Sequence, residues 1–420
     1  MTERLLQYIW QFQYYNKNEL NTTSGEDLVI IHPGNYNTHQ GPDFLEGRIR
    51  IGGNTWIGNI ELHVNESDWH RHQHSLDKNY NNVILHVVWS SDELYSGHEI
   101  PTLNLSDRVP KILLQQYYYW MKGDYFIPCE STAGYADELV WTSWKERLVM
   151  ERLERKSEYV LSLLKKGNFH WEEILWWMMA RNFGLSVNAD AFGEMAASIP
   201  YNLLAKHRKQ IHQLEALMFG QAGLLDTEFD DKYPAMLKKE YLFLKKKYKL
   251  EKILLPVHFL RMRPACFPTV RLAQLAMLIH STGNIFSVLL NASTINEIRM
   301  VLNITANDYW HYHFRFGETT VYQPKILGRE MINNILLNTV ITVLFAYGKY
   351  HREHAFQHKA IEWINELPPE HNAVITKFRG IGVTIRNASE SQSLIELKSQ
   401  YCDRKRCLDC AIAGAVLRKI

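Results

Sequence analysis

The chain has 420 residues, of which 46% are hydrophobic and 22% charged, and this composition predicts a globular protein long enough for two domains. A net charge of +2 excludes a global electrostatic attraction to nucleic acid or to a membrane surface, so nucleic-acid binding would need a local basic patch. We expect no membrane span because no apolar run reaches about 18 residues, and no signal peptide because the first residues lack its pattern.

The first third of the chain predicts a helix followed by strands. Residues 3–20 have the spacing of an amphipathic helix, and residues 28–36 predict a short strand broken by Pro-Gly. Residues 47–64, GRIRIGGNTWIGNIELHV, place two strand-like segments around Gly-Gly-Asn, which predicts a β-hairpin. A polar stretch follows, and VILHVVW at residues 83–89 predicts a strand that is buried on both faces.

From residue 137 onward the apolar residues recur with a helical period, and long helical segments make up most of the remaining chain. Together these patterns predict an α+β protein, in which an N-terminal mixed sheet is followed by a larger all-helical domain. We place the boundary after residue 128, which gives domains 1–128 and 129–420.

Two carboxylates and a histidine are arranged around the predicted hairpin. Asp43 precedes its first strand, and Glu61 and His63 are two residues apart on its second strand, so both point to one face that the hairpin can bring beside Asp43. Neighbouring carboxylates bind Mg²⁺ or Mn²⁺, which polarises a phosphate and lowers the pKa of a bound water. We therefore predict that Asp43 and Glu61 hold the cation and that His63 orients or deprotonates the water. Taken singly, each residue also fits an ordinary solvated position.

The segments GPDF and ELH, joined by the hairpin, resemble the D…ExK signature of the PD-(D/E)xK nuclease superfamily over roughly residues 1–105. The resemblance implies a restriction-endonuclease-like fold with an αβββαβ core, in which Asp43 and Glu61 take the places of the two acids. It also implies a glutamate from the first helix, either Glu3 or Glu19. His63 takes the place of the lysine and departs from the pattern, because neutral histidine is a base or a metal ligand rather than a fixed cation.

We therefore expect a divalent-metal-dependent nuclease that hydrolyses phosphodiesters of nucleic acid. Arg48, Arg50 and Arg71 are the candidates for contacting the phosphate. The alternative is a catalytically inactive module that keeps the nuclease fold and binds nucleic acid or protein. The sequence does not indicate which oligomeric state the protein adopts.

A run of histidines follows the hairpin. His70, His72 and His74 alternate in DWHRHQH. If this segment is extended, the three rings point one way and can bind a transition metal together with Asp68, whereas a helix scatters them around its axis. His86, within the apolar strand, is predicted to be buried and to reach the site only if its strand is central.

The C-terminal segment YCDRKRCLDCAI contains Cys402, Cys407 and Cys410 in a C-x4-C-x2-C spacing. Two thiolates separated by two residues can hold one metal ion, and a closed tetrahedral site needs a fourth ligand, for which Cys129 is the first candidate and Cys266 the second. Zn²⁺ and a [4Fe–4S] cluster both fit four sulfurs. The alternative is a group of free buried thiols. The odd number of cysteines, five, favours a reduced, cytoplasmic compartment.

Over nearly the whole chain, motifs such as GNIELHVNESDWHRH, RPACFPTVRLAQLA and YCDRKRCLDCAI resemble an uncharacterised bacterial family that is known only as a domain of unknown function. This resemblance implies no activity and no functional residues.

Overall fold

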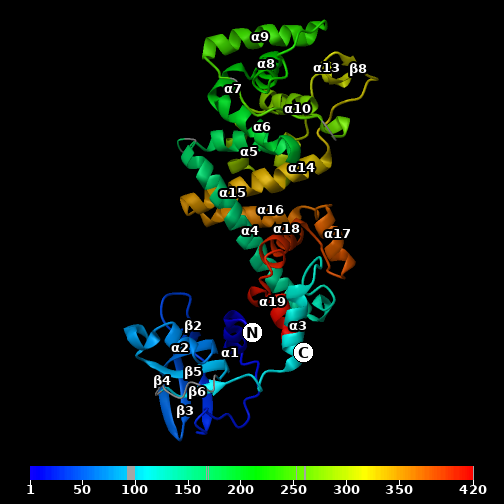
Figure 1. Ribbon diagram of the computed structural model, residues 1–420. Coiled ribbons are helices and arrows are strands. Elements are labelled where there is room, and N and C mark those ends of the chain that lie inside the picture. The colour runs from blue at the N-terminus through cyan, green and yellow to red at the C-terminus, as the bar shows by residue number, and fades with distance from the viewer. Residues whose placement is uncertain (92–99, 167, 169, 252, 260–261, 420) are drawn as a thin grey trace. The chain divides into compact units, whose positions relative to one another are not determined.

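The computed structural model describes the chain except for residues 92–99, 167, 169, 252, 260–261 and 420. The chain divides into two compact units (Figure 1), of which the first contains residues 1–144, 380–383 and 397–420 and the second residues 145–379 and 384–396. Residues 129–144 and the C-terminal segment, which are predicted above to be part of the helical domain, belong to the first compact unit.

The protein is α+β, with a mixed sheet in the first unit and a helical region after it. The sheet has the order β1-β3-β4-β5-β6, and β2 pairs with β3. Its strands are β1 (Leu28–His32), β2 (Asn35–Tyr36), β3 (Phe44–Ile51), β4 (Asn54–Asn65), β5 (Val83–Ser90) and β6 (Thr102–Asn104).

Strands β3 and β4 form the predicted hairpin, and β4 continues into parallel pairing with β5. The turn uses Gly52 and Gly53, whose φ angles of 53° and 86° lie in the left-handed region that glycine adopts without steric penalty. Near Glu61 and His63, β4 pairs with β5 on one side, and on the other side the backbone N–H of Leu62 donates to the Asp43 side chain. Both faces of the strand are covered there. The Glu61 and His63 side chains are only 5% and 1% exposed, so they are interior residues and not solvated ones.

The first helix, α1 (Glu3–Gln11), is shorter than the predicted 3–20. It ends because Gln13 turns the chain with a φ of 52°, a conformation that an α-helix cannot continue. Its N-terminus is capped by the Thr2 hydroxyl, which accepts a hydrogen bond from the backbone N–H of Leu5. The apolar face of α1 is buried, and the helix packs against β4 (Figure 1).

The polar stretch after β4 folds into short helices. These are α2 (Asp68–Arg71) and the single 3₁₀ turns η1 (His74–Leu76) and η2 (Lys78–Tyr80). Between α2 and η1, Gln73 has a φ of 59°, which reverses the chain direction so that η1 returns toward α2.

The first unit is completed by segments from the middle and the end of the chain: α3 (Lys111–Lys122), η3 (Ala133–Tyr135), the π-helix η6 (Leu397–Cys402), η7 (Cys407–Asp409) and α19 (Ala411–Arg418). The C-terminal segments are tied to the α1 region by an ion pair between Arg4 and Asp409 at 2.7 Å and by a hydrogen bond from Arg418 to the Tyr14 hydroxyl at 2.7 Å. Contacts between distant parts of a chain are not visible in local sequence patterns. The sequence therefore predicts these segments to be part of the helical domain.

The second unit is built almost entirely from helices around one large apolar core. The division between the units falls within α4 (Glu138–Lys166), after Trp144. The further elements are α5 (Trp171–Phe183), α6 (Leu185–Ser198), α7 (Tyr201–His207), α8 (Ile211–Gln221), α9 (Lys232–Tyr248), η4 (Pro264–Cys266), α10 (Pro268–Ser281), α11 (Ile285–Asn291), α12 (Ile295–Val301), α13 (Asp308–His311), β7 (His313–Arg315), β8 (Glu318–Thr319), α14 (Arg329–Ile335), the π-helix η5 (Leu336–Val340), α15 (Ile341–His351), α16 (His354–Glu366), α17 (Ala373–Gly380) and α18 (Ala388–Glu396).

One helix of the second unit is long and apolar enough to cross a membrane. It runs from Arg329 to His351, and 78% of its apolar window is buried inside the protein, as in the core helix of a globular domain. Helices α10 and α11 meet the same criterion only when joined, and they are bent by 69° at their junction.

The second unit buries an acid, Glu215 of α8. Its carboxylate accepts hydrogen bonds from the Tyr233 hydroxyl at 2.6 Å, from Trp310 Nε1 at 3.0 Å and from the Asn307 amide. Burial raises the pKa of Glu215 to about 7, and the three hydrogen bonds oppose this rise by favouring the ionised form.

We predict that this carboxyl makes the unit less stable as the pH rises. The pKa of Glu215 is about 7 in the folded chain and about 4.5 when the group is solvated, so its contribution to stability is complete below about 4.5 and is lost as the pH rises through 7. The loss is on the order of 3 kcal/mol. Urea unfolding of the wild type and of Glu215→Gln at pH 5 and pH 8 measures this loss as a change in the free energy of unfolding. If the two proteins differ in this free energy by the same amount at both pH values, Glu215 is not the group responsible.

Candidate metal centre

The site lies on β4 and draws residues from several segments around it. Glu61 and His63 are on β4 itself, and Asp43 comes immediately before β3. His72 and His74 come from the polar segment that covers β4, and His86 comes from β5, where its Cα pairs with that of Glu61.

Asp43 and Glu61 are brought together by hydrogen bonds, as the hairpin predicts. The backbone N–H of Asp43 donates to Glu61 Oε2 at 3.0 Å, and the backbone N–H of Leu62 donates to Asp43 Oδ2 at 3.1 Å. The Gln7 amide donates to Asp43 Oδ1 at 2.8 Å and is 3.4 Å from Glu3 Oε1. Each carboxylate is therefore held in place by main-chain or helix-borne donors.

The two acids repel each other when both are ionised. Burial raises the pKa of Asp43 to about 6, while the hydrogen bonds from Gln7 and Leu62 oppose the rise. Burial also raises the pKa of Glu61 to about 9, and the negative charges of Asp43 and Glu3 add to it. Two carboxylates in one dry site are stabilised by a shared proton or by a cation, and a divalent cation removes the repulsion between them.

The structure distinguishes between the two glutamates considered for the first helix. Glu3 lies at the start of α1 and acts electrostatically on both acids. Glu19 lies beyond the end of the helix, in a left-handed conformation with a φ of 49°, and its carbonyl accepts a hydrogen bond from Arg108. Of the two, Glu3 is the one that belongs to the acidic group.

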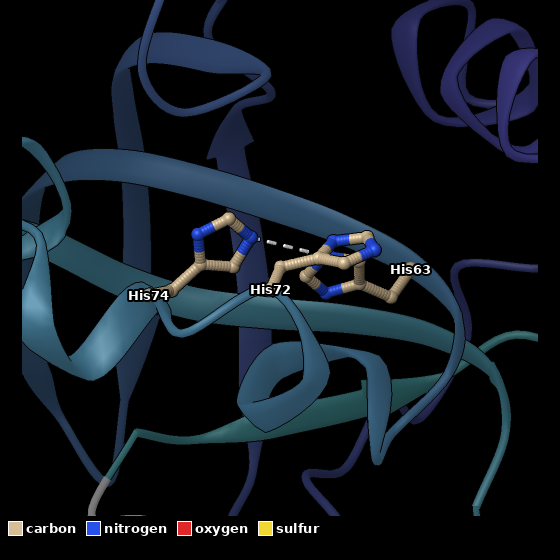
Figure 2. A group of neighbouring side chains, drawn as sticks. All are labelled: His63, His72 and His74. Atoms are coloured by element: carbon tan, nitrogen blue, oxygen red, sulfur yellow. Dashed lines mark hydrogen bonds between the residues drawn. The ribbon is translucent and has the colours of Figure 1, made fainter.

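Three histidines converge beside Glu61 (Figure 2). His63 Nε2 is 3.2 Å from His72 Nδ1 and 3.3 Å from His74 Nε2. Glu61 Oε1 is 3.6 Å from His63 Nε2 and 3.5 Å from His74 Nε2. Among the residues that the structure describes, the three histidines form the one group of at least three potential ligands whose atoms all lie within 4.8 Å of one another.

A further shell of side chains orients these rings. His63 Nδ1 is 2.9 Å from Nε2 of His86, which is fully buried as predicted and does reach the site from its central strand. The ring of His74 stacks on that of Tyr80 with centroids 3.8 Å apart. Burial lowers the pKa of His74, and the neighbouring His72 lowers it too, which favours the neutral imidazole that binds metals.

The polar segment is helical and not extended, so the rings of His70, His72 and His74 do not all point one way. His70 lies on α2, whereas His72 caps that helix and His74 follows the left-handed turn at Gln73, so only the latter two face His63. Asp68 is also used differently. Its Oδ2 accepts the backbone N–H of Asn65 at 3.1 Å, and its Oδ1 pairs with Arg71 at 2.8 Å.

The arginines predicted to contact phosphate are not all near the acids. Arg48 and Arg50 are exposed on β3, toward the hairpin turn, and pair with Ile57 and Thr55 of β4. Arg48 is five residues from Asp43 along the strand, which is about 16 Å of extended chain. Arg71, next to His72 on α2, is the one of the three that lies beside the site in sequence and structure.

Four cysteines belong to the first unit, and all five in the chain are free thiols. α19 begins directly after Cys410 and packs against η7, which begins at Cys407, and against η3, which follows Cys129. Burial raises the pKa of the Cys129 thiol, and the charges of Cys410 and Cys407 contribute. Cys402 is affected in the same way by the other three.

The fifth cysteine, Cys266, belongs to the second unit, where its sulfur is 3.6 Å from Arg271. Burial raises the pKa of the Cys410 thiol, and hydrogen bonds from the backbone N–H groups of Ala413 and Ile412 and from Trp144 oppose the rise. A metal site with Cys129 as its fourth ligand stays a prediction.

Sequence reasoning missed Gln7 and Tyr80. Gln7 lies four residues after Glu3, one helical turn, and that spacing was a usable signal. The stacking of Tyr80 on His74 depends on the two single-turn helices in the polar segment, for which the sequence has no regular pattern.

The family described as "Protein of unknown function (DUF2851)" matches residues 3–373, and the chain belongs to this family. Neither the curated proteins nor the solved structures include a match to the chain.

We predict that the cysteine group binds a metal ion or cluster. Protein purified without oxygen should contain zinc, or iron with sulfide, and Cys407→Ser should lose that content because it removes one of four ligands. Cys266→Ser is the matched control and should keep it, since Cys266 is in the other unit. Elemental analysis and visible absorption measure both. Equal metal content in the two variants would contradict the prediction.

Proposed function

We propose that the first unit hydrolyses phosphodiester bonds of nucleic acid with the help of a divalent cation, Mg²⁺ or Mn²⁺. The observation that carries the proposal is the direct hydrogen bond between Asp43 and Glu61, in which the Asp43 backbone N–H donates to Glu61 Oε2 at 3.0 Å. Two carboxylates fixed side by side at the end of a hairpin are a donor set suited to these hard cations. Glu3 adds a third negative charge to the same group.

The order of elements supports a PD-(D/E)xK-like core. The chain runs α1, β1, β3, β4, α2, β5, which is the αβββαβ order that the resemblance implies, with the short β2 as an insertion. In this comparison Asp43 and Glu61 take the places of the two acids, and His63 takes that of the lysine.

Such a site hydrolyses a phosphodiester by attack of water on phosphorus and departure of the ester oxygen. The bound cation supplies polarisation of the phosphate and a lower pKa for the attacking water. In this proposal His63 accepts the proton of that water. When its Nδ1 carries the hydrogen and donates to His86, the lone pair of its Nε2 faces the Glu61 carboxylate. The leaving oxygen takes a proton from solvent.

One observation favours the alternative of a binding module without catalysis. Arg48 and Arg50 lie on an exposed face of β3 near the hairpin turn, away from the acids, with the 61% exposed Ile57 beside Arg48. Basic and apolar side chains on one exposed face can hold a nucleic-acid backbone without any cation. On this alternative the buried polar group on β4 has a structural role.

We predict that the protein cleaves DNA or RNA in Mn²⁺ and that Asp43→Asn and Glu61→Gln reduce the rate by at least about 100-fold, since each removes a cation ligand at unchanged shape. Glu46→Gln, an exposed acid on β3, is the matched control and should cleave like the wild type. The assay uses single-stranded and double-stranded DNA and RNA.

If the wild-type protein cleaves none of these substrates in Mg²⁺ or Mn²⁺ while it is folded, the proposal fails. Binding of the same nucleic acids that is lost in Arg48→Gln and Arg50→Gln then supports the alternative.

A further inference from the structure

We propose that Glu61, His63, His72 and His74 form a binding site for a divalent transition-metal ion, with Zn²⁺ as the probe. This site is distinct from the Mg²⁺ or Mn²⁺ site at Asp43 in its ligands and in the class of metal it selects. It shares Glu61 and His63 with the proposed nuclease site, but the argument for it stands on the convergence of the three histidines.

Four of the separations among the ligand atoms are close to those of a tetrahedral site. Ligands held at 2.0 to 2.1 Å from a tetrahedral zinc ion are about 3.4 Å apart. The Nε2 atom of His63 is 3.2 Å from His72 and 3.3 Å from His74. Glu61 Oε1 is 3.6 Å from His63 and 3.5 Å from His74, and the ligand atoms of the three histidines all lie within 4.8 Å of one another.

Hydrogen bonding among the neutral rings does not account for this convergence. His63 Nε2 has either one hydrogen or one lone pair, so it can make a good hydrogen bond to only one of the two imidazole nitrogens that flank it. A cation between these ligand atoms accepts the lone pairs of all three rings and of the carboxylate together. Figure 2 shows the ring of His74 turned toward the other two rings, with a dashed line between His74 and His63.

The ligand types select the class of metal. Imidazole nitrogens suit zinc, iron, copper and nickel, whereas magnesium and calcium prefer sites made of oxygen ligands. Three imidazoles and one carboxylate therefore favour a transition metal at the histidines, while the Asp43 and Glu61 oxygens suit a harder cation.

The second shell holds the ligands in position before any metal binds. His63 is oriented by His86 at 2.9 Å, and the second oxygen of Glu61 accepts the Asp43 N–H at 3.0 Å. His74 is fixed by stacking on Tyr80. Partners of this kind fix the tautomer and direction of metal-binding rings and contribute about 10- to 100-fold to metal affinity.

The site has a consequence that rests on the proposed function. Glu61 directs Oε1 toward the histidines and Oε2 toward Asp43. A metal ion at the histidines would use the lone pair of His63 Nε2 that accepts the proton of the water in the proposed hydrolysis, so zinc bound there should inhibit cleavage.

The test measures zinc binding to the metal-stripped full-length chain by equilibrium dialysis and calorimetry. His72→Ala should bind one equivalent less, or bind it at least about 100-fold more weakly, because a ligand is lost. His72 is exposed, so this truncation leaves the buried core intact, and thermal unfolding verifies the fold. His32→Ala, an exposed histidine of β1, should bind like the wild type. His72→Asp, which offers an oxygen near the place of Nδ1, should recover much of the affinity.

The outcomes separate this inference from the proposed function. Equal zinc stoichiometry and affinity in His72→Ala and the wild type overturn the inference, whether or not the protein cleaves nucleic acid. Loss of one zinc in His72→Ala supports it, even if no substrate is cleaved. Zinc binding that persists in Asp43→Asn, while cleavage in Mn²⁺ is lost, supports two separate cation sites.

Discussion

Strand β4 carries Glu61 and His63 into the interior of the first unit, where an ionisable side chain needs partners because water does not surround it. The rest of the site follows from this constraint. Asp43 and the segment before β3 supply a backbone donor to Glu61, and β5 supplies His86 to His63. The remaining faces of both side chains are covered by histidines from the polar segment, so the group is closed on several sides by nitrogen and oxygen atoms.

A buried group of this composition is costly for the apo protein. The repulsion between Asp43 and Glu61 opposes folding, and His63 Nε2 lies against two imidazole nitrogens, of which it can hydrogen-bond well to only one. Cation binding removes both penalties, so the account links metal binding to the stability of the first unit. Stability that is sacrificed at a set of polar residues is a common property of functional sites.

Local patterns were sufficient for the hairpin and for the pairing of Asp43 with Glu61. The period of two along a strand and the Gly-Gly-Asn turn determine which side chains share a face, and both act over a few residues. For the polar segment the sequence left two alternatives open, because the direction of His74 depends on one left-handed residue, Gln73, that a polar sequence does not specify. The place of Arg48 relative to the acids depends on its position along the eight-residue strand β3.

Long-range contacts could not be predicted from local sequence patterns. The return of the C-terminal segment to the α1 region depends on pairs such as Arg4 with Asp409, which are 405 residues apart. The burial of Glu61 likewise depends both on the neighbouring strand β5 and on the polar segment that covers β4. These contacts decide that the acids and histidines form one closed group instead of a solvated strand face.

The most direct measurement of the central claim is anomalous diffraction from crystals of the full chain grown with Zn²⁺ and Mn²⁺ and recorded on both sides of the zinc absorption edge. The account predicts a zinc peak at bonding distance from Glu61, His63, His72 and His74, and a manganese peak bonded to Asp43 and the other oxygen of Glu61. It is contradicted if Glu61 carries neither metal and keeps its hydrogen bond to the Asp43 backbone, with zinc bound only at the cysteines.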